Sequence, residues 1–398
     1  TPNSQSLYLY QMALTLKELG YDVCMLYQIN NEYTKVIPSY KGMIPTPGNY
    51  SVEVMTKQAA FAEANGYGNV VAAMNISLSW YDSAYYDAHP ELVGEPLGYM
   101  ILDGVQYTNS QGKTAGAQTC LVINFDEKDG VARPSDIPKV MVRSTKDAIT
   151  GWEEQVIPAN FGFLVKNGEM VNKTATHKDG DPRSMLGVKA DGTIVMVMND
   201  GRQAPFSHGF TEYEMSEFML KMGCVYAING DGGGSSQFLS QRPGEELALH
   251  CLPSDGSPRA TTHGVLVIST APSTGEFVRA HVETDNVYYT PFSSVQFKAT
   301  GADLAGGAAE IPADAVWKLS DASFGSIDEN GLFVSNGKTG EVEAQLVYNG
   351  EIKGSSSINI VIPDSIAFGT AQAYTVPFGE SVNLKVTAKY GVFDVTLK

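Results

Sequence analysis

Short apolar runs, separated by turn residues, make up most of the first 270 residues. Runs of this length bounded by Gly, Asn or Asp are typical of buried strands. Asp-Gly and Asn-Gly pairs between several of them indicate β-hairpins, because these residues tolerate the positive φ that tight hairpin turns need. The pattern predicts strands over residues 69–74, 98–102, 120–125, 139–143, 162–165, 185–189, 193–198, 224–229, 237–239 and 263–269.

Two segments have a helical pattern instead, over residues 54–64 and 211–222. In the second, Thr211 and Glu214 have the spacing of a capping box, and a glycine follows the last turn. Residues 1–20 fit either a helix or a strand. Many short strands and few helices predict an α+β domain with mixed or antiparallel sheets, rather than regular βαβ alternation.

The pattern changes after residue 270. Residues 270–277 are small and polar and contain a proline, as expected of a linker. Residues 278–362 show short alternating strands without a helix, which predicts an all-β sandwich. Residues 363–398 begin a further β domain with too few strands to close, so we expect a truncated domain in a longer natural protein. The first domain then occupies residues 50–269, with residues 1–49 packed on it.

The composition narrows the classes of partner. The chain has 44 acidic and 27 basic side chains, a net charge of −17. Binding to a phosphate backbone relies on clustered Lys and Arg, which this sequence lacks, so no nucleic-acid partner is expected. A small anion is compatible with this charge, because screening limits the reach of distant acidic groups. No apolar run is long enough to span a membrane, and residues 1–20 contain no signal peptide.

The four cysteines, Cys24, Cys120, Cys224 and Cys251, have no metal-binding spacing. Cys224 and Cys251 flank a glycine-rich turn, and a disulfide between them would close a loop there. Burial as small apolar side chains is the favoured reading of all four.

The strongest candidate for chemistry is that turn, Asn229-Gly230-Asp231-Gly232-Gly233-Gly234-Ser235-Ser236. A hairpin needs at most two glycines, so three in a row after a strand favour a binding site. Their N–H groups can form an anion-binding concavity, and Asp231 adds a carboxylate beside it. No Lys follows the glycines, which excludes a P-loop, and no G-x-G-x-x-G opens a helix here, which excludes a dinucleotide fingerprint.

The residues from Ala227 to Ser236 resemble the signature of the phosphodiester glycosidase family, and the resemblance covers roughly residues 50–269. The other motifs of that family occur in order along the chain. They are the strand end Ala73-Met74-Asn75, the strand opening Pro182-Arg183, the hairpin Asp191-Gly192, the turn Asp200-Gly201-Arg202, the run Ser207-His208-Gly209 and the helix 211–222.

Two positions depart from the family pattern. Members usually have Gly-Gly-Phe-Phe after the upstream asparagine, where this chain has residues 76–80, ISLSW. They usually have Leu before the signature aspartate, where this chain has Gly230. Both departures change the wall of the expected pocket, so they bear on the substrate more than on the reaction.

The resemblance implies hydrolysis of a sugar 1-phosphodiester with release of an N-acetylglucosamine-like sugar. Such a substrate is an anion, which suits Arg side chains, and its cleavage passes through an oxocarbenium-like state that a carboxylate stabilises or attacks. Asp200 alternatively pairs with an Arg and orients it. The expected catalytic residues are Asp231, Arg183 and Asp200, and the expected substrate-binding residues are Asn75, Arg202, Asn229, Gly232, Gly233, Gly234, Ser235, Ser236, Ser207 and His208.

Residues 315–342 resemble bacterial Ig-like domains of surface proteins, in which a Trp is buried and an Asn-Gly pair turns a hairpin. This implies a secreted or cell-surface bacterial protein, with a glycoconjugate, cell wall or surface glycan as partner. No cofactor is expected to be required, and a structural calcium ion is left open. Two alternatives remain: a carbohydrate-binding or adhesion protein without turnover, and a metal-dependent phosphodiesterase with Asp231 and Asp200 as ligands.

Overall fold

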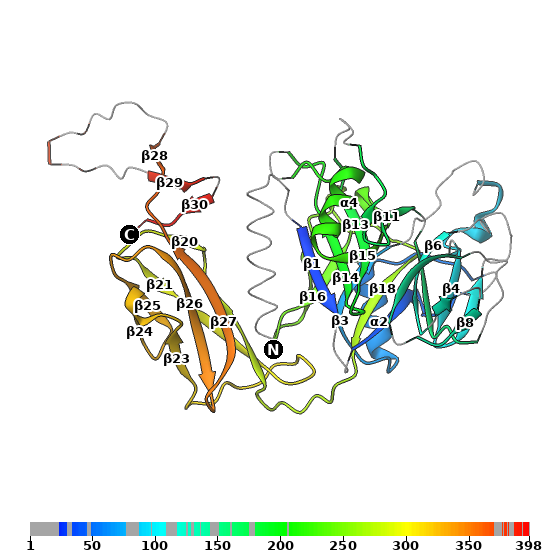
Figure 1. Ribbon diagram of the computed structural model, residues 1–398, viewed down its shortest axis with the longest axis horizontal. Helices are drawn as coiled ribbons and strands as arrows, with labels where there is room; N and C mark the ends of the chain where they lie inside the picture. The colour runs from blue at the N-terminus through cyan, green and yellow to red at the C-terminus, as the bar shows by residue number, and fades with distance from the viewer. Residues whose placement is uncertain are drawn as a thin grey trace. The chain divides into compact units, whose positions relative to one another are not determined.

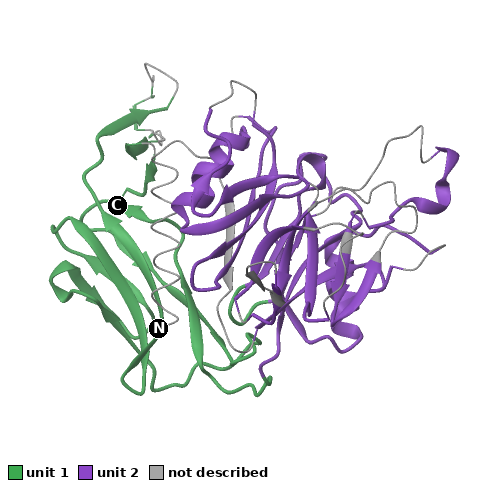
Figure 2. Ribbon diagram, turned by 45° about the vertical axis from the view of Figure 1, so that its right-hand side comes forward, with its two compact units in different colours: residues 1–19, 242–245, 272–398 green, residues 20–241, 246–271 purple. Residues whose placement is uncertain are grey.

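The computed structural model of the chain divides into two compact units, which are described separately (Figures 1 and 2). Unit 2 comprises Gly20–Gln241 and Glu246–Ala271, and unit 1 includes Arg242–Glu245 and Pro272–Lys398. The expected helix or strand over residues 1–20 lies outside the described residues. These are residues 24–29, 34–45, 49–76, 87–96, 98–108, 118–124, 126–128, 131–135, 137–143, 151–159, 161–174, 180–204, 207–369, 376, 378–379, 381, 386–391 and 393–397.

In its described residues, unit 2 contains three antiparallel sheets and a short ribbon, β7 (Asp126–Lys128) with β8 (Val131–Arg133). The first sheet has the order β1 (Cys24–Ile29), β14 (Ile194–Asn199), β13 (Arg183–Lys189), β15 (Cys224–Asn229), β11 (Phe163–Lys166) and β12 (Glu169–Met170). The second has the order β5 (Val105–Thr108), β4 (Tyr99–Leu102), β10 (Gln155–Ala159), β6 (Gln118–Ile123) and β9 (Lys139–Arg143). The third has the order β17 (Leu247–Leu249), β16 (Phe238–Gln241), β3 (Asn69–Asn75), β18 (His263–Ser269) and β2 (Thr34–Tyr40).

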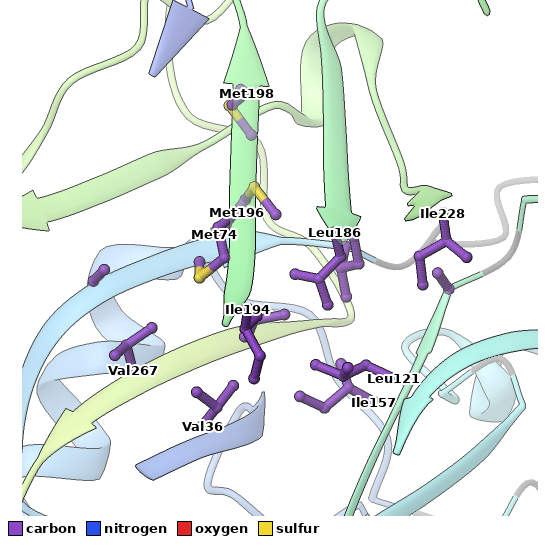
Figure 3. Packing of buried hydrophobic residues seen from close by; sticks show 14 of the residues in the cluster. Val36, Met74, Leu121, Ile157, Leu186, Ile194, Met196, Met198, Ile228 and Val267 are labelled. Carbon is purple, nitrogen blue, oxygen red and sulfur yellow. The ribbon is translucent and has the colours of Figure 1, made fainter. Parts of the chain in front are cut away.

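One hydrophobic core joins all three sheets (Figure 3). Met196 and Leu186 enter it from the first sheet, Ile157 from the second, and Met74 and Val267 from the third. Burying each such side chain contributes about 1.5–3 kcal/mol, so the core fixes the relative placement of the sheets within this unit. The ends of strands from different sheets are thereby held next to one another.

Two α-helices occur in the described part of the chain, α2 (Met55–Ala64) and α4 (Glu212–Lys221). Thr211 caps α4 as predicted: its side chain accepts from the Glu214 N–H, and the Glu214 carboxylate accepts from the Thr211 N–H at 2.7 Å. A Cβ at Gly187 on β13 would lie 2.6 Å from Met219 Cε of α4, so this glycine lets the helix pack closely on the sheet.

The expected α+β class is therefore only partly right, because the described chain is mostly β-sheet. The strands expected in 69–269 occur, with ends shifted by a few residues. The apolar pattern did not predict β2, which contains Pro38 and forms an edge of the third sheet beside β18. Since β1 and β2 are integral strands of these sheets, the domain takes in residues before residue 50.

Unit 1 is all-β apart from the single 3-10 turn η3 (Ala322–Phe324), in its described residues. The Ig-like assignment of this unit stays a prediction: Trp317 is only partly buried, although Gly331 of the Asn-Gly pair has the expected positive φ of 79°. One sheet of this unit has the order β20 (Tyr288–Tyr289), β27 (Glu351–Ile360), β26 (Gly340–Tyr348) and β23 (Val316–Leu319), and another has the order β21 (Ser294–Gln296), β25 (Leu332–Ser335) and β24 (Gly325–Ile327). β19 (Arg279–Glu283) pairs with β22 (Lys298–Ala302). The sheet nearest the end of the chain has the order β28 (Ser365–Phe368), β29 (Val386–Tyr390) and β30 (Phe393–Val395).

Residues 273–275 of the expected linker are hydrogen-bonded to unit 1. The Asp303 carboxylate accepts hydrogen bonds from Ser273 Oγ at 2.9 Å and from the N–H groups of Thr274 and Gly275. Among the helices that the structure describes, none has the length and apolar character needed to cross a membrane.

Candidate functional site

The glycine-rich turn lies where the chain leaves β15 in the first sheet and enters β16 in the third. Arg183 opens β13 directly opposite Asn199, the last residue of β14, and Met185 pairs with Asn229 at the end of β15. These three strand ends meet at one edge of the first sheet. The register therefore brings Arg183 at the start of β13, the Asp200-Gly201-Arg202 turn and the glycine-rich turn together.

Asn75 holds the backbone of the glycine-rich turn at both ends. Its Nδ2 donates to the Asp231 carbonyl at 3.1 Å, and its Oδ1 accepts from the Gln237 N–H at 2.8 Å. Ser184 Oγ also donates to the Asp231 carbonyl. Asn75 is fully buried, so the structure gives this predicted substrate-binding residue a scaffolding role.

Two of the three glycine N–H groups have partners within the protein. The Gly233 N–H donates to the Pro182 carbonyl at 2.8 Å, and the Ser235 and Ser236 N–H groups close the 3-10 turn η2 (Gly233–Ser235). The Gly232 N–H is directed at the Asp231 carboxylate. The backbone donors of this turn hold the fold of the turn itself, because a buried N–H without a partner is costly.

Two of the three glycines leave room for a charged side chain from another segment, and the third lets the backbone approach closely. A Cβ at Gly233 would lie 3.1 Å from Arg202 Nη1. A Cβ at Gly232 would collide first with the Pro182 carbonyl oxygen, and Arg183 Cδ would lie 3.2 Å from it. A Cβ at Gly234 would collide with the carboxylate of Asp255. Gly233 also has φ of 61°, which other residues adopt only with strain. Arg202 and Asp255 therefore lie at two successive glycines, with Arg183 close to the third.

Asp231 is a buried carboxyl group between cations. Only 4% of the residue is exposed, and its Oδ2 has no hydrogen-bond partner in the described structure. Burial raises the pKa of Asp231 to about 6, although a Ser235 hydrogen bond, the charge of Arg259, the Gly232 N–H and the charge of Arg183 all favour the ionised form. An incompletely paired buried carboxylate is typical of functional sites.

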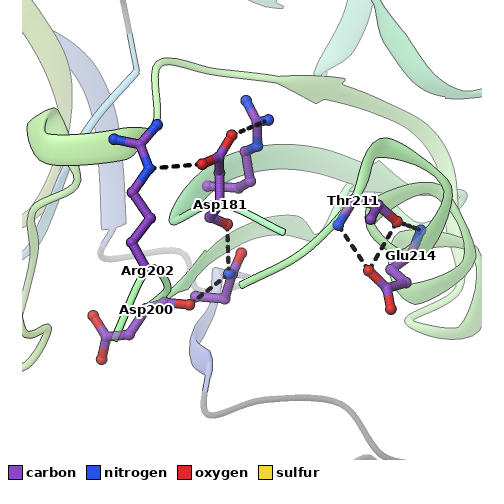
Figure 4. Close-up of polar contacts among 7 residues, drawn as sticks. Asp181, Asp200, Arg202, Thr211 and Glu214 are labelled. Carbon is purple, nitrogen blue, oxygen red and sulfur yellow. Dashed lines mark hydrogen bonds and ion pairs between the residues drawn. The ribbon is translucent and has the colours of Figure 1, made fainter. Parts of the chain in front are cut away.

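Asp181 pairs with two of the arginines at once (Figure 4). Its Oδ2 lies 2.9 Å from Arg183 Nη2, and its Oδ1 lies 2.7 Å from Arg202 Nε. Asp181 was not predicted as a site residue, although it directly precedes the Pro182-Arg183 motif. It takes the orienting role that the sequence suggested for Asp200.

Asp200 is buried and holds a loop rather than an arginine. Its Oδ1 accepts from the Leu252 N–H at 2.8 Å, and burial raises its pKa. Ser207 Oγ donates to the Asp200 carbonyl at 2.6 Å, which also assigns this predicted binding residue to the scaffold. His208 is exposed, and its carbonyl accepts from the Arg202 N–H at 3.4 Å.

The segment of residues 252–259, which we call the Leu252 loop, carries two charged residues that the sequence did not single out, Asp255 and Arg259. Arg259 Nη1 lies 3.4 Å from Ser235 Oγ, and Asp255 pairs with the Arg259 guanidinium. The sequence signal was weak, because residues 253–259 read as an ordinary Pro- and Gly-containing loop.

The remaining predicted binding residues are buried at the turn. Asn229 Oδ1 and Ser236 Oγ have no hydrogen-bond partner in the described structure, and Ser235 bonds to the Asp231 carboxylate. Cys224 and Cys251 are buried free thiols, as the favoured reading predicted. Across the described residues, no three His, Cys, Asp or Glu side chains are grouped so that they could hold a metal ion.

Ile76 and Gly230, one residue from each departure from the family pattern, lie next to each other, whereas residues 77–80 lie outside the described residues. A Cβ at Gly230 would collide with Ile76 Cδ1 and would lie 2.9 Å from the Ile76 carbonyl oxygen. Ile76 is fully buried and belongs to the common core. An isoleucine after the upstream Asn and a glycine before Asp231 therefore compensate for each other in volume.

A family described as phosphodiester glycosidase matches residues 68–268, about half of the chain. A prophage-derived uncharacterised protein of Bacillus subtilis, YomE, is 33% identical over 156 residues, which are 36% of this chain and 22% of that protein. The chain thus spans about a fifth of the length of that relative.

Two solved structures are also similar. One is the zebrafish N-acetylglucosamine-1-phosphodiester alpha-N-acetylglucosaminidase catalytic domain, with 19% identity, a TM-score of 0.38, and coverage of 62% of this chain and 82% of that one. The other is a hypothetical protein from Synechocystis, with 11% identity, a TM-score of 0.35, and coverage of 61% and 58%. Because the family match extends from the start of β3 almost to the end of β18 and includes the whole glycine-rich turn, this chain belongs to the phosphodiester glycosidase family.

Proposed function

We propose that this chain hydrolyses a sugar 1-phosphodiester and that Asp231 is the catalytic carboxylate. The observation that supports this most is the buried, incompletely paired carboxylate of Asp231 beside the arginine-rich face of the glycine turn. Guanidinium groups bind phosphate oxygens through paired hydrogen bonds. A carboxylate beside a bound phosphodiester is suitably placed to act on the sugar carbon attached to it.

The proposed chemistry uses the ionised form of Asp231. Its pKa of about 6 leaves the side chain mostly ionised at neutral pH, so it can attack or stabilise an oxocarbenium-like sugar. The departing phosphate is weakly basic, and the arginines neutralise its charge. The reaction therefore needs less help from a second carboxyl group acting as a proton donor than hydrolysis of an alkyl glycoside does.

The finer assignments follow from the family rather than from the geometry. We propose an N-acetylglucosamine-like sugar as the released group and a glycoconjugate or surface glycan as the substrate. We also propose action outside a bacterial cell, which is supported by the resemblance of residues 315–342 to modules of surface proteins. Asp231, Arg183 and Arg202 are proposed to contact the substrate, whereas Asn75, Asp200 and Ser207 position the segments that carry them.

Asp231→Asn tests the reaction. We expect it to abolish release of sugar from a sugar phosphodiester or a UDP-sugar while binding of the substrate is largely kept. Thr211→Ala is a suitable control, because it removes only a helix cap. If the wild-type chain binds these compounds but releases no sugar from any of them, it is a carbohydrate-binding protein and the proposal is wrong.

Hydrolysis in ¹⁸O-labelled water tests which bond breaks. Cleavage of the sugar C–O bond puts the label on the sugar, and cleavage of the P–O bond puts it on the phosphate. We expect the label on the sugar. Label on the phosphate, together with loss of activity on adding a chelator, would establish a metal-dependent phosphodiesterase instead.

A further inference from the structure

Two arginines are held at the glycine-rich turn in the same way. Arg202 is held through its Nε by Asp181 at 2.7 Å, and its Nη groups lie beside Gly233. Arg259 is held through its Nε by Asp255 at 3.0 Å, and the Asp255 carboxylate lies over Gly234. The two arginines are 57 residues apart in the sequence, yet each is oriented by an aspartate, and Arg202 and Asp255 lie at adjacent glycines.

The donor groups of Arg259 show what this arrangement leaves available. A guanidinium has five N–H donors, arranged along edges that match the oxygens of a phosphate. Asp255 Oδ2 accepts from Nε and Nη2, and Ser235 Oγ lies within reach of Nη1. One N–H on each Nη nitrogen is left over. The side chain is 41% exposed, so a ligand in solution can reach it.

The loop that carries Arg259 is anchored on both sides of the residue. The Leu252 N–H is bound by the Asp200 carboxylate, and the Arg259 carbonyl accepts from Gln237 Nε2 at 2.6 Å. Thr261 pairs with Glu53 in an isolated bridge. Because the backbone is fixed and Asp255 orients the side chain, little conformational entropy remains to be lost when an anion binds.

We propose that Arg259 is a further phosphate-binding arginine of this site, held by an aspartate as Arg202 is, and that Asp255 is its positioning residue. The ligand is the phosphodiester group of the substrate, so this inference rests on the proposed function. Arg202 and Arg259 each take one non-bridging oxygen of that group. The glycines at 233 and 234 make this possible, because any side chain there would displace Arg202 or Asp255.

Inorganic phosphate is the probe that separates this inference from the hydrolytic reaction. In calorimetric titrations of the full chain, Arg259→Ala should weaken phosphate binding by about ten- to a hundredfold, which corresponds to loss of a charged hydrogen-bonded pair. Arg259→Lys should recover little of that affinity, because an ammonium group lacks the guanidinium fork. Arg242→Ala is the matched control, since Arg242 is 48% exposed and has an acidic partner, Glu283, outside the site. This control should bind phosphate as the wild type does.

Asp255→Ala tests the positioning role by the sign of its effect. Removing a negative charge beside an anion site would by itself tighten phosphate binding. A positioning residue requires the reverse, so we expect weaker binding, and tighter binding would show that Asp255 only opposes the anion. In hydrolysis assays, Arg259→Ala should raise KM more than it lowers kcat, with an unchanged thermal midpoint.

Phosphate binding by Arg259→Ala equal to that of the wild type, or no phosphate binding by the wild type, would overturn the inference. If the wild type binds phosphate through Arg259 but hydrolyses no sugar phosphodiester, the inference stands and the proposed reaction fails. If hydrolysis is present and is unaffected by Arg259→Ala, the reaction stands and this role of Arg259 is wrong.

Discussion

At the scale of single residues, burial and charge divide the predicted site into two groups. One group has polar atoms that are unpaired or exposed: Asp231, Arg183 and Arg202. In the other group, the Asn75 side chain bonds to the backbone of the turn, and the Asp200 side chain bonds to the backbone of the Leu252 loop. Residue type alone did not separate the groups, because an Asn or Asp at a strand end can either bind a substrate or hold the backbone, and its sequence is the same in both cases.

The raised pKa of Asp231 predicts that this residue reduces the stability of the folded chain at neutral pH. An aspartate normally ionises near pH 3.8, but in the folded chain Asp231 keeps its proton up to about pH 6. The folded state therefore binds the proton more tightly, and the contribution of Asp231 to stability falls as the pH rises from about 4 to 6. Asp231→Asn should raise the free energy of unfolding by about 2–3 kcal/mol at pH 7 and leave it unchanged below pH ~4.

Chemical denaturation over a range of pH measures this effect, and Asp191 provides a control of opposite sign. The Asp191 carboxylate accepts hydrogen bonds from Thr193, chiefly from its backbone N–H, and these bonds lower the pKa of Asp191. The contribution of Asp191 to the free energy of unfolding is present at neutral pH and is lost as the pH falls through its lowered pKa. Asp191→Asn should therefore destabilise the chain at pH 7. A loss of stability at pH 7 on Asp231→Asn would contradict the role given to its burial.

Asp181 should matter for function and little for stability. Its two ion pairs are partly exposed, with 28% of the Asp181 side chain accessible, so they contribute about 0–1 kcal/mol after screening. Without Asp181 both arginines lose the partner that orients them. Asp181→Ala should therefore lower kcat/KM for a sugar phosphodiester by about tenfold or more, because misplaced contacts weaken catalysis steeply.

The control for Asp181→Ala is Asp103→Ala, which removes another acidic group from unit 2. Asp103 bonds with Lys35 and Gln155 in the hairpin between β4 and β5. Steady-state kinetics and thermal melts of both variants measure the effect. Equal kinetic losses in the two variants, or a large fall in stability with Asp181→Ala, would contradict a positioning role.

At the scale of secondary structure elements, strand register brings the site together. β13, β14 and β15 are neighbours in one antiparallel sheet, and the turn after β15 crosses into another sheet. Alternation and turn signals predicted these strands well, because period-two patterns and Asp-Gly pairs are local features. The order of the strands was not predictable, because the pairing of β15 with β13 rather than with a sequence neighbour depends on contacts distant in the chain.

The pairing of Ile76 and Gly230 predicts coupling between the ends of β3 and β15. Gly230→Ala should cost about 1–3 kcal/mol, because the added methyl collides with Ile76 Cδ1. Ile76→Val removes that one methyl group and by itself should cost about 0.5–1.5 kcal/mol. The double variant should be more stable than the sum of the two losses implies. Denaturant titrations of the four proteins in this cycle give the coupling, and strict additivity would contradict the volume exchange.

At the scale of the whole molecule, the residues of the proposed site all belong to unit 2. The chain carries a net charge of −17, yet three arginines stand at one glycine-rich turn. Charges more than about 8–10 Å away are screened at physiological ionic strength, so the local cations control anion binding. The absence of a nucleic-acid partner stays a prediction from the net charge, and that charge is compatible with a phosphate ligand.

This location predicts that unit 2 carries the activity by itself. A fragment of residues 20–271 should fold cooperatively and hydrolyse a sugar phosphodiester with a kcat/KM within about threefold of the full chain, because no site residue is removed. That range corresponds to less than ~1 kcal/mol of transition-state stabilisation. Arg259→Ala made within this fragment should show the same fold-change as in the full chain. A folded but inactive fragment would show that unit 1 contributes to the reaction.

The sequence alone predicted many of the strands of unit 2, the capping box of α4, the glycine-rich turn with Asp231, and the family, because these depend on local patterns and ordered motifs. The tertiary structure was needed to show that Gly233 and Gly234 make room for Arg202 and Asp255, and that the Gly233 N–H bonds to the Pro182 carbonyl. Only it selected Asp181 and Arg259 as partners of the turn. The physical reason is that charge pairing and close packing depend on distances between segments far apart in the chain, which strand order and core packing set.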